Sequence, residues 1–205
     1  FKFKATDHSG ASGFKGFDQV VSGRMTRAYL KIQDGCNAFC SYCIIPHARG
    51  ASVSMPEHEV MRHLDILGRD GFNEVILTGI HTGLYGHDLT PETTLSALME
   101  KIDQKRPVNR IRLSSIEPIE ITDQMIDLAG TNRVLCDHFH IPLQSGDDHV
   151  LQQMKRPYTA AQFDHIVGRI HDRLPFCGIG IDVLVGFPGE TEDRFEKTFN
   201  RIKNL

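Results

Sequence analysis

The sequence contains no long apolar run and no strong excess of one charge. None of its apolar stretches approaches the ~18 residues that a membrane-spanning helix needs, so we expect no membrane partner and a cytoplasmic location. The formal net charge is −3, and the basic side chains are concentrated in residues 1–31, which carry six basic and two acidic side chains. The remainder is more acidic than basic, which argues against a long electrostatic groove for nucleic acid in the main body.

Cysteine is also scarce, and its distribution excludes a disulfide framework. The 205 residues hold five cysteines, an odd number, and no signal-peptide pattern precedes them. Cys136 and Cys177 lie in apolar surroundings and far apart, which is typical of small core residues. The other three, Cys36, Cys40 and Cys43, fall within eight residues.

The close spacing of these three cysteines predicts a metal site. Crowded thiolates repel one another, but each can bind one iron of a 4Fe-4S cube, which cysteine thiolates normally hold. Three protein ligands leave one iron open, and an open coordination position distinguishes a reactive metal site from a closed structural one. A zinc site is the alternative, but it needs a fourth ligand at zinc-like spacing, and His47 is the only imidazole nearby.

The chain alternates between strand-like and helical patterns after residue 24. The first 24 residues are rich in Gly, Ser, Lys and Phe and predict a linker or the tail of a preceding domain. Helical spacing and N-terminal signals (Ser54 with Pro56, Thr122, Thr159) separate the strands. The strands are predicted over Ala28–Gln33, Glu74–Thr78, Arg110–Ser114, Asp137–Leu143 and Gly180–Val185. A repeating β-α order with short connections predicts a parallel sheet with right-handed crossovers, either open or curled into a barrel.

Period-two alternation makes one face of this sheet polar. His138, His140 and Gln144 oppose apolar neighbours, as do Arg110, Arg112 and Ser114 on the third strand and Asp182 on the fifth. In a barrel these side chains would line the lumen and predict a cavity for a charged ligand. The alternative is a buried network of ion pairs, such as Arg112 with Asp182, and a weaker one is a metal held by His138 and His140.

Three loops with the composition of binding sites follow strands. They are the cysteine loop, the segment Thr78–Gly83, and the segment Gly186–Thr191, where two glycines and a proline predict a tight turn into a helix. Because ligands of parallel β/α sheets bind at the carboxyl edge of the strands, we expect the three loops to converge there.

Several segments of the sequence resemble those of a known enzyme family. The Cys-x3-Cys-x2-Cys loop resembles that of the radical S-adenosylmethionine (SAM) enzymes. The surrounding segments resemble the methylthiotransferases among them: Gln33–Asn37, Cys43–Pro46 with Ala48–Gly50, His140–Gly146, Met154–Arg156 and Gly186–Thr191. The segment Leu77–Gly83 is most similar to the branch that acts on threonylcarbamoyladenosine beside the tRNA anticodon.

The resemblance implies a fold and a chemistry. The fold is an α/β, partial (β/α)6 radical SAM barrel, truncated after the fifth strand and its helix. The cofactors are a 4Fe-4S cluster and SAM, which one electron from the cluster would cleave to methionine and a 5'-deoxyadenosyl radical. Cys36, Cys40 and Cys43 would be the metal ligands. The residues expected to bind the cofactor are Tyr42, Ser114, Gln144, Arg156, Asp182 and Gly186. Tyr42 would shield the cluster and help to hold the adenine edge of SAM. The lumen residues Ser114, Gln144 and Asp182 would contact its ribose or amino acid part, and Arg156 would pair with its carboxylate.

The resemblance also implies missing parts and partners. We expect residues 25–205 to be a core domain that is incomplete at its C-terminus, with a tRNA substrate and a low-potential electron donor as partners. A second 4Fe-4S cluster is expected only in a missing N-terminal domain, and the main RNA-binding domain is expected beyond the C-terminus. The alternatives are a methylthiotransferase for isopentenyladenosine tRNA or for a ribosomal-protein aspartate, and a non-catalytic iron-sulfur electron-transfer or structural metal module.

Overall fold

The computed structural model describes residues 26–131 and 133–205. The predicted linker over residues 1–24 therefore lies outside the described residues. In chain order the elements are β1 (Arg27–Lys31), β2 (Gln33–Asp34), α1 (Ile45–Arg49), β3 (Val53–Ser54), α2 (Glu57–Arg69), β4 (Glu74–Thr78), η1 (Thr82–Leu84), α3 (Leu95–Lys105), β5 (Arg110–Leu113), η2 (Pro118–Glu120), α4 (Asp123–Thr131), β6 (His138–His140), α5 (Asp148–Gln153), α6 (Ala160–Arg173), β7 (Gly178–Gly180) and α7 (Glu192–Lys203).

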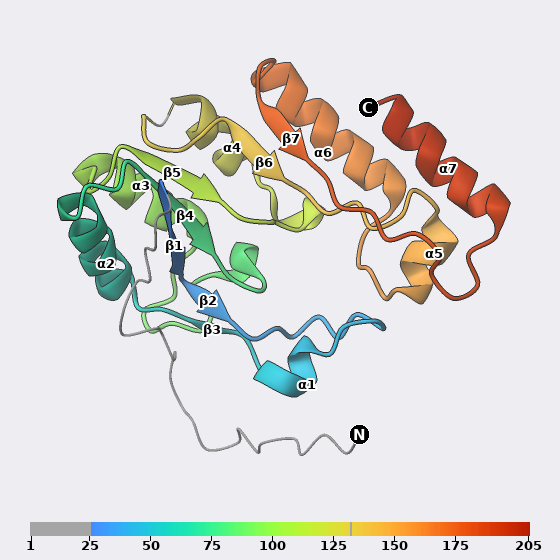
Figure 1. The fold of residues 1–205 in the computed structure, drawn as a ribbon, viewed down its shortest axis with the longest axis horizontal. Helices are drawn as coiled ribbons and strands as arrows, with labels where there is room; N and C mark the ends of the chain where they lie inside the picture. The colour runs from blue at the N-terminus through green and yellow to red at the C-terminus, as the bar shows by residue number, and fades with distance from the viewer. Residues whose placement is uncertain (1–25, 132) are drawn as a thin grey trace.

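Five parallel strands lie side by side in chain order. β1 pairs with β4 and β4 with β5, while β6 pairs with β7. The parallel bridges Ile111–Leu135 and Ser115–His140 join the two groups. Figure 1 shows the strands fanning out in this order, with the longer helices beside them. The predicted parallel β/α sheet is confirmed.

The core lies between the apolar face of the sheet and four helices. The members of this core are almost fully buried, and they come from β1, β4, β5 and β6 and from α2, α3, α4 and α6. In α2, for example, Val60, Leu64 and Leu67 recur at helical spacing and are all buried. Alternation along β1 and β5 thus buries one face and leaves the other more exposed, whereas β4 buries Val75, Ile76 and Leu77 in a row.

Two helix starts follow the sequence signals and one does not. Thr159 and Gln162 form a capping box at the start of α6, and Thr122 accepts a hydrogen bond from the N–H of Met125 before α4. Ser54, however, belongs to β3, and α2 begins after Pro56 without a side-chain cap. The hydroxyl of Ser54 instead accepts a hydrogen bond from the N–H of Gly86.

The last two strands are shorter or shifted relative to the prediction. Regular pairing covers His138–His140 and Gly178–Gly180, and beyond them one bridge among the described residues, Gln144–Val183, continues the ladder. The reason is local, since Pro142 has no N–H to donate and Gln144 has a positive φ of 60°.

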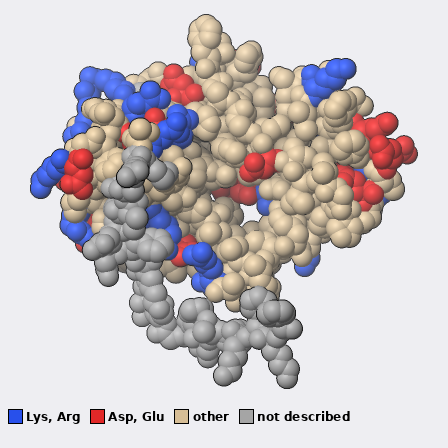
Figure 2. Space-filling model, in the orientation of Figure 1, with Lys and Arg blue, Asp and Glu red and all other residues tan. Residues whose placement is uncertain are grey.

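Charged side chains are mixed over the surface. On the face drawn in Figure 2, Lys and Arg gather mainly on the side that carries α2, β1 and β4, and acidic side chains line a hollow near the middle. Among the described residues, no helix has the length and the apolar composition needed to cross a membrane.

Candidate functional site: a cysteine loop held by three neighbouring loops

The cysteine loop leaves the sheet through a narrow neck. β2 and β3 pair antiparallel on either side of it, and the N–H of Cys36 donates to the carbonyl of Gly50 at 3.1 Å. Gly35 has a φ of +70°, and a Cβ atom there would lie 2.0 Å from the Ala51 carbonyl oxygen. Only glycine fits this crossing, at which the chain enters the cysteine loop.

The tip of the loop is tied to the end of α5. The N–H of Ser41 donates to the carbonyl of Met154 at 3.1 Å, and its hydroxyl donates to the carbonyl of Gln153 at 2.8 Å. Cys36 and Cys40 are buried, and Cys43 is partly exposed. The three thiols therefore lie on a fixed loop that opens toward solvent on one side.

Gln33 connects the cysteine loop to the loop after β4. Its side chain is completely buried, and its amide nitrogen donates to the carbonyl of Gly35 at 2.8 Å. Its amide oxygen accepts the N–H groups of Ile80 and His81 at 2.9 and 2.7 Å. Both ends of the amide are satisfied, so this side chain locks two of the predicted loops together.

His81 lies between Cys36 and Glu120. Its Nδ1 is 3.4 Å from the Cys36 sulfur, and its Nε2 forms an ion pair with Glu120. Burial lowers the pKa of His81, but the Glu120 carboxylate outweighs it and holds that pKa above its usual value. Gly83 leaves the room that Glu120 occupies, because a Cβ there would lie 2.0 Å from a Glu120 carboxylate oxygen.

Arg156 joins the second cysteine to the loop after β5. Its Nη1 donates to the Cys40 sulfur at 3.2 Å, its Nε donates to the Tyr158 hydroxyl at 3.2 Å, and its Nη2 forms an ion pair with Glu117. The side chain is only 5% exposed. A buried guanidinium is retained when its donors are matched, as they are here.

Tyr42 and the Gly186 turn complete the convergence. The Tyr42 ring meets the Phe187 ring edge-on, with centroids 6.4 Å apart, and its hydroxyl accepts from Arg156 Nη1 at 3.5 Å. Burial raises the pKa of Tyr42 to about 12, so the phenol is neutral at physiological pH. Gly186 has a φ of +73° with open space around it, and its N–H donates to Glu190. The three predicted loops thus meet at one edge of the sheet.

The predicted lumen residues lie on the polar face. The Ser114 hydroxyl is buried without a hydrogen-bond partner among the described residues, and the side chain of Gln144 is half-buried. Asp182 is exposed and pairs with His140 Nε2 at 2.9 Å. The suggested pair of Arg112 with Asp182 is not formed, because Arg112 donates to Glu74 at 2.9 Å. Polar groups therefore line this face, and Ser114 keeps an unused donor there.

The residues of the cysteine loop fit an iron-sulfur cluster. Burial raises the pKa of the Cys36 thiol, and the nearby Cys40 and Cys43 sulfurs raise it further, so bound iron would relieve the repulsion among these thiols. All five cysteines are free, and Cys136 is buried as predicted. No three His, Cys, Asp or Glu side chains of the described residues are grouped to hold a single metal ion. A 4Fe-4S cube needs its three cysteine sulfurs farther apart than the ligands of a single ion, because each thiolate binds a different iron.

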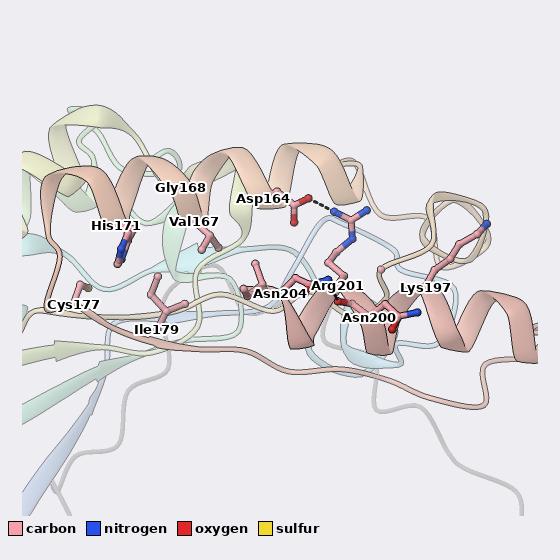
Figure 3. Close-up of a pocket in the computed structure, with 12 residues that line it drawn as sticks. Asp164, Val167, Gly168, His171, Cys177, Ile179, Lys197, Asn200, Arg201 and Asn204 are labelled. Atoms are coloured by element: carbon pink, nitrogen blue, oxygen red, sulfur yellow. Dashed lines mark hydrogen bonds and ion pairs between the residues drawn. The ribbon is translucent and has the colours of Figure 1, made fainter.

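A separate hollow lies beside β7, the last strand. It has a volume of about 890 Å³ between α6, α7 and β7 (Figure 3). Arg201 of α7 pairs with Asp164 of α6 across it, and Cys177, which is half-buried, lines one end. None of the predicted site residues lines this hollow.

Sequence reasoning missed four residues at the site: Gln33, His81, Glu117 and Glu120. Gln33 and His81 stand in the segments that were singled out, but neither position has a spacing that indicates its contacts. The two glutamates have no local signal at all, since their partners are 39 residues away in both cases.

Comparison with known proteins adds two findings. A family model described as "Radical SAM superfamily" matches residues 30–202. The chain is 45% identical over 178 residues to the threonylcarbamoyladenosine tRNA methylthiotransferase MtaB of Bacillus subtilis, covering 87% of this chain and 40% of that protein. It is 34% identical over 179 residues to the tRNA-2-methylthio-N(6)-dimethylallyladenosine synthase of Carboxydothermus hydrogenoformans, covering 87% and 41%. The chain thus spans about two fifths of the length of these relatives.

Solved structures show the same fold. The radical S-adenosylmethionine methyltransferase TsrM from Kitasatospora setae superposes with a TM-score of 0.71 at 18% identity, covering 86% of this chain and 34% of that one. Coproporphyrinogen III oxidase HemN from Escherichia coli gives 0.59 at 15% identity, covering 86% and 41%. The arrangement of strands and helices predicted from the sequence is therefore found in solved proteins.

Proposed function

Because this chain belongs to the radical SAM superfamily, we propose that it is the radical-generating core of a methylthiotransferase acting on threonylcarbamoyladenosine in tRNA. The observation that carries the proposal is the convergence of the Cys36–Cys43 loop with the loops after β4 and β7 at the carboxyl edge of the sheet. The higher identity to MtaB, 45% against 34% for the dimethylallyladenosine synthase, favours this substrate branch. We further propose a cytoplasmic location and a low-potential electron donor.

Cys36, Cys40 and Cys43 would hold a 4Fe-4S cluster. When bound, the cluster supplies the electron that cleaves SAM to methionine and a 5'-deoxyadenosyl radical. The loop contributes a rigid set of three thiolates, and its tip stays fixed by the Ser41 contacts to the end of α5. Tyr42, packed edge-on against Phe187, would cover one side of the site and limit water entry.

The polar face of the sheet would orient SAM. The unused Ser114 hydroxyl, Gln144 and Asp182 are the proposed contacts to its ribose and amino acid parts, and the Gly186 turn lets backbone approach it closely. Arg156 stays the proposed partner of the carboxylate, because the second N–H of its Nη1 makes only a long contact of 3.5 Å to the Tyr42 hydroxyl, which a carboxylate oxygen could replace.

Loss of the Asp182 carboxylate should weaken SAM binding. We expect Asp182→Ala to raise the Kd for SAM about tenfold, because a charge-assisted hydrogen bond contributes ~1.5 kcal/mol. Asp182 is 60% exposed at its side chain, so the melting temperature should change little. Isothermal titration of the reconstituted protein measures the first, and thermal denaturation the second. Unchanged SAM binding with a sharp fall in melting temperature would make Asp182 a structural partner of His140 instead.

The proposed function is tested on the modified nucleoside itself. The full-length protein should be incubated with reductant, SAM and tRNA that carries threonylcarbamoyladenosine without the methylthio group, and nucleosides should be identified by mass spectrometry. We expect a gain of one methylthio group on threonylcarbamoyladenosine and none on isopentenyladenosine. A product on isopentenyladenosine alone moves the protein to the other branch. Absence of both products, with SAM still cleaved, removes it from the tRNA methylthiotransferases.

A further inference from the structure

Two of the three cysteine sulfurs face a side-chain nitrogen of a residue that a glutamate holds in place. We propose that Arg156 and His81 donate hydrogen bonds to the Cys40 and Cys36 sulfurs and thereby raise the reduction potential of the bound cluster. The two glutamates, Glu117 and Glu120, stand three residues apart in the loop after β5. This inference rests on the proposed cluster site and goes beyond it, since it assigns how the protein tunes the cluster.

The Arg156 arm is fixed from three sides. Glu117 binds Nη2, the Tyr158 hydroxyl accepts from Nε, and the Tyr158 ring lies below the guanidinium with its centroid 5.1 Å away. Tyr158 is itself held, because its hydroxyl donates to the carbonyl of Pro142 at 2.9 Å. The planar guanidinium therefore has one orientation, and in it Nη1 points at Cys40 from 3.2 Å.

The His81 arm is fixed in the same manner. Gln33 accepts the N–H of His81 and of the residue before it, which sets the backbone. Glu120 engages Nε2, which turns Nδ1 toward the Cys36 sulfur at 3.4 Å. The missing side chain at Gly83 is what lets the Glu120 carboxylate reach the ring. The small residues of the segment Thr78–Gly83 thus allow the Glu120 side chain to come close to the His81 ring.

The physical effect of both arms has one sign. Reduction adds an electron to the cluster, and part of that negative charge lies on the ligand sulfurs. Hydrogen bonds to the sulfurs stabilise the reduced state and are among the features that set cluster potentials. Cys43 has no such side-chain donor among the described residues, so the stabilisation is confined to two of the three ligands.

The test is a redox titration of the reconstituted full-length holoenzyme in the absence of SAM. The titration is monitored by the magnetic resonance signal of the reduced cluster, and the signal that belongs to this cluster is identified by its change when SAM is added afterwards. We expect Arg156→Met and His81→Phe each to shift the midpoint potential to a more negative value. The double variant should shift by about the sum, because the donors reach different sulfurs. Arg156→Lys keeps the positive charge but lacks the planar guanidinium with its several N–H groups. The shift of its midpoint potential should therefore be smaller than that of Arg156→Met.

Two variants serve as matched controls. Arg201→Met removes a guanidinium from an Arg–Asp pair between α6 and α7, and His63→Phe removes an imidazole that is 12% exposed, as the His81 imidazole is. Both should keep the wild-type potential. Potentials equal to wild type in Arg156→Met and His81→Phe overturn the inference alone, and Arg156→Gln and His81→Leu replace them where those changes prevent iron loading. A wild-type protein without any SAM-responsive signal overturns the proposed cluster site, and the inference with it.

Discussion

Replacing Cys40 with alanine should abolish the iron-sulfur cluster. Anaerobic reconstitution of the wild-type chain should give about four irons per chain, the content of one 4Fe-4S cluster. Cys40 is 9% exposed, and its sulfur meets the fixed guanidinium of Arg156. Neither Cys136 nor Cys177 can replace it. Cys136 is buried just before β6, and Cys177 lines the hollow beside α6. Iron analysis and the visible absorbance of the cluster measure the loss.

Cys136→Ala is the control for the loss of iron. Cys136 is also buried, at 7% exposure, and its sulfur accepts from Arg110 at 3.5 Å, away from the cysteine loop. This variant should keep the full iron content. About eight irons in the wild-type chain would show that Cys136 and Cys177 had been interpreted wrongly. A full complement in Cys40→Ala would remove Cys40 from the ligand set.

The parallel β/α sheet could be predicted from the sequence because it depends on local patterns, and the assignment of the three cysteines as ligands, which depends on their spacing, stays a prediction. The spacing of Cys36, Cys40 and Cys43 restricts them to one short loop, and alternation along β1 and β5 indicates which face is buried. The helix capped by Thr159 was predictable for the same reason, since its capping box spans only four residues. In all these cases the deciding interactions lie within a few residues.

The rest of the site depends on contacts that the chain forms only after folding. Arg156 reaches Cys40 across 116 residues, and Gln33 reaches His81 across 48. Nothing near Glu117 or Glu120 indicates their partners. The ends of the last two strands were also wrong, because Pro142 and the positive φ of Gln144 interrupt regular pairing beyond His140, and alternation of residue types carries no information on such a break. Local sequence predicted which loops matter, and tertiary contacts determined how they are joined.

Replacing Gly35 with alanine should disrupt the neck of the cysteine loop. An alanine Cβ would lie 2.0 Å from the Ala51 carbonyl oxygen and 2.8 Å from that of Gly50, and both are backbone atoms that cannot rotate away. The positive φ adds a strain of ~1–2 kcal/mol. We expect the Cys36 N–H to lose its bond to Gly50, the loop to splay, and cluster assembly to fall to a small fraction of wild type.

Gly50→Ala separates strain from clash in this experiment. Gly50 has a φ of +81° and a ψ of −162°, a backbone conformation that is strained for alanine, but nothing lies within 4 Å of a Cβ atom added there. We expect Gly50→Ala to lower the free energy of unfolding by about 1–3 kcal/mol and to load iron almost normally. Iron content and thermal denaturation of both variants decide the matter. Equal iron loading in the two would mean that the neck tolerates displacement, and that the Ser41 contacts at the tip of the loop are what hold the three cysteines in place.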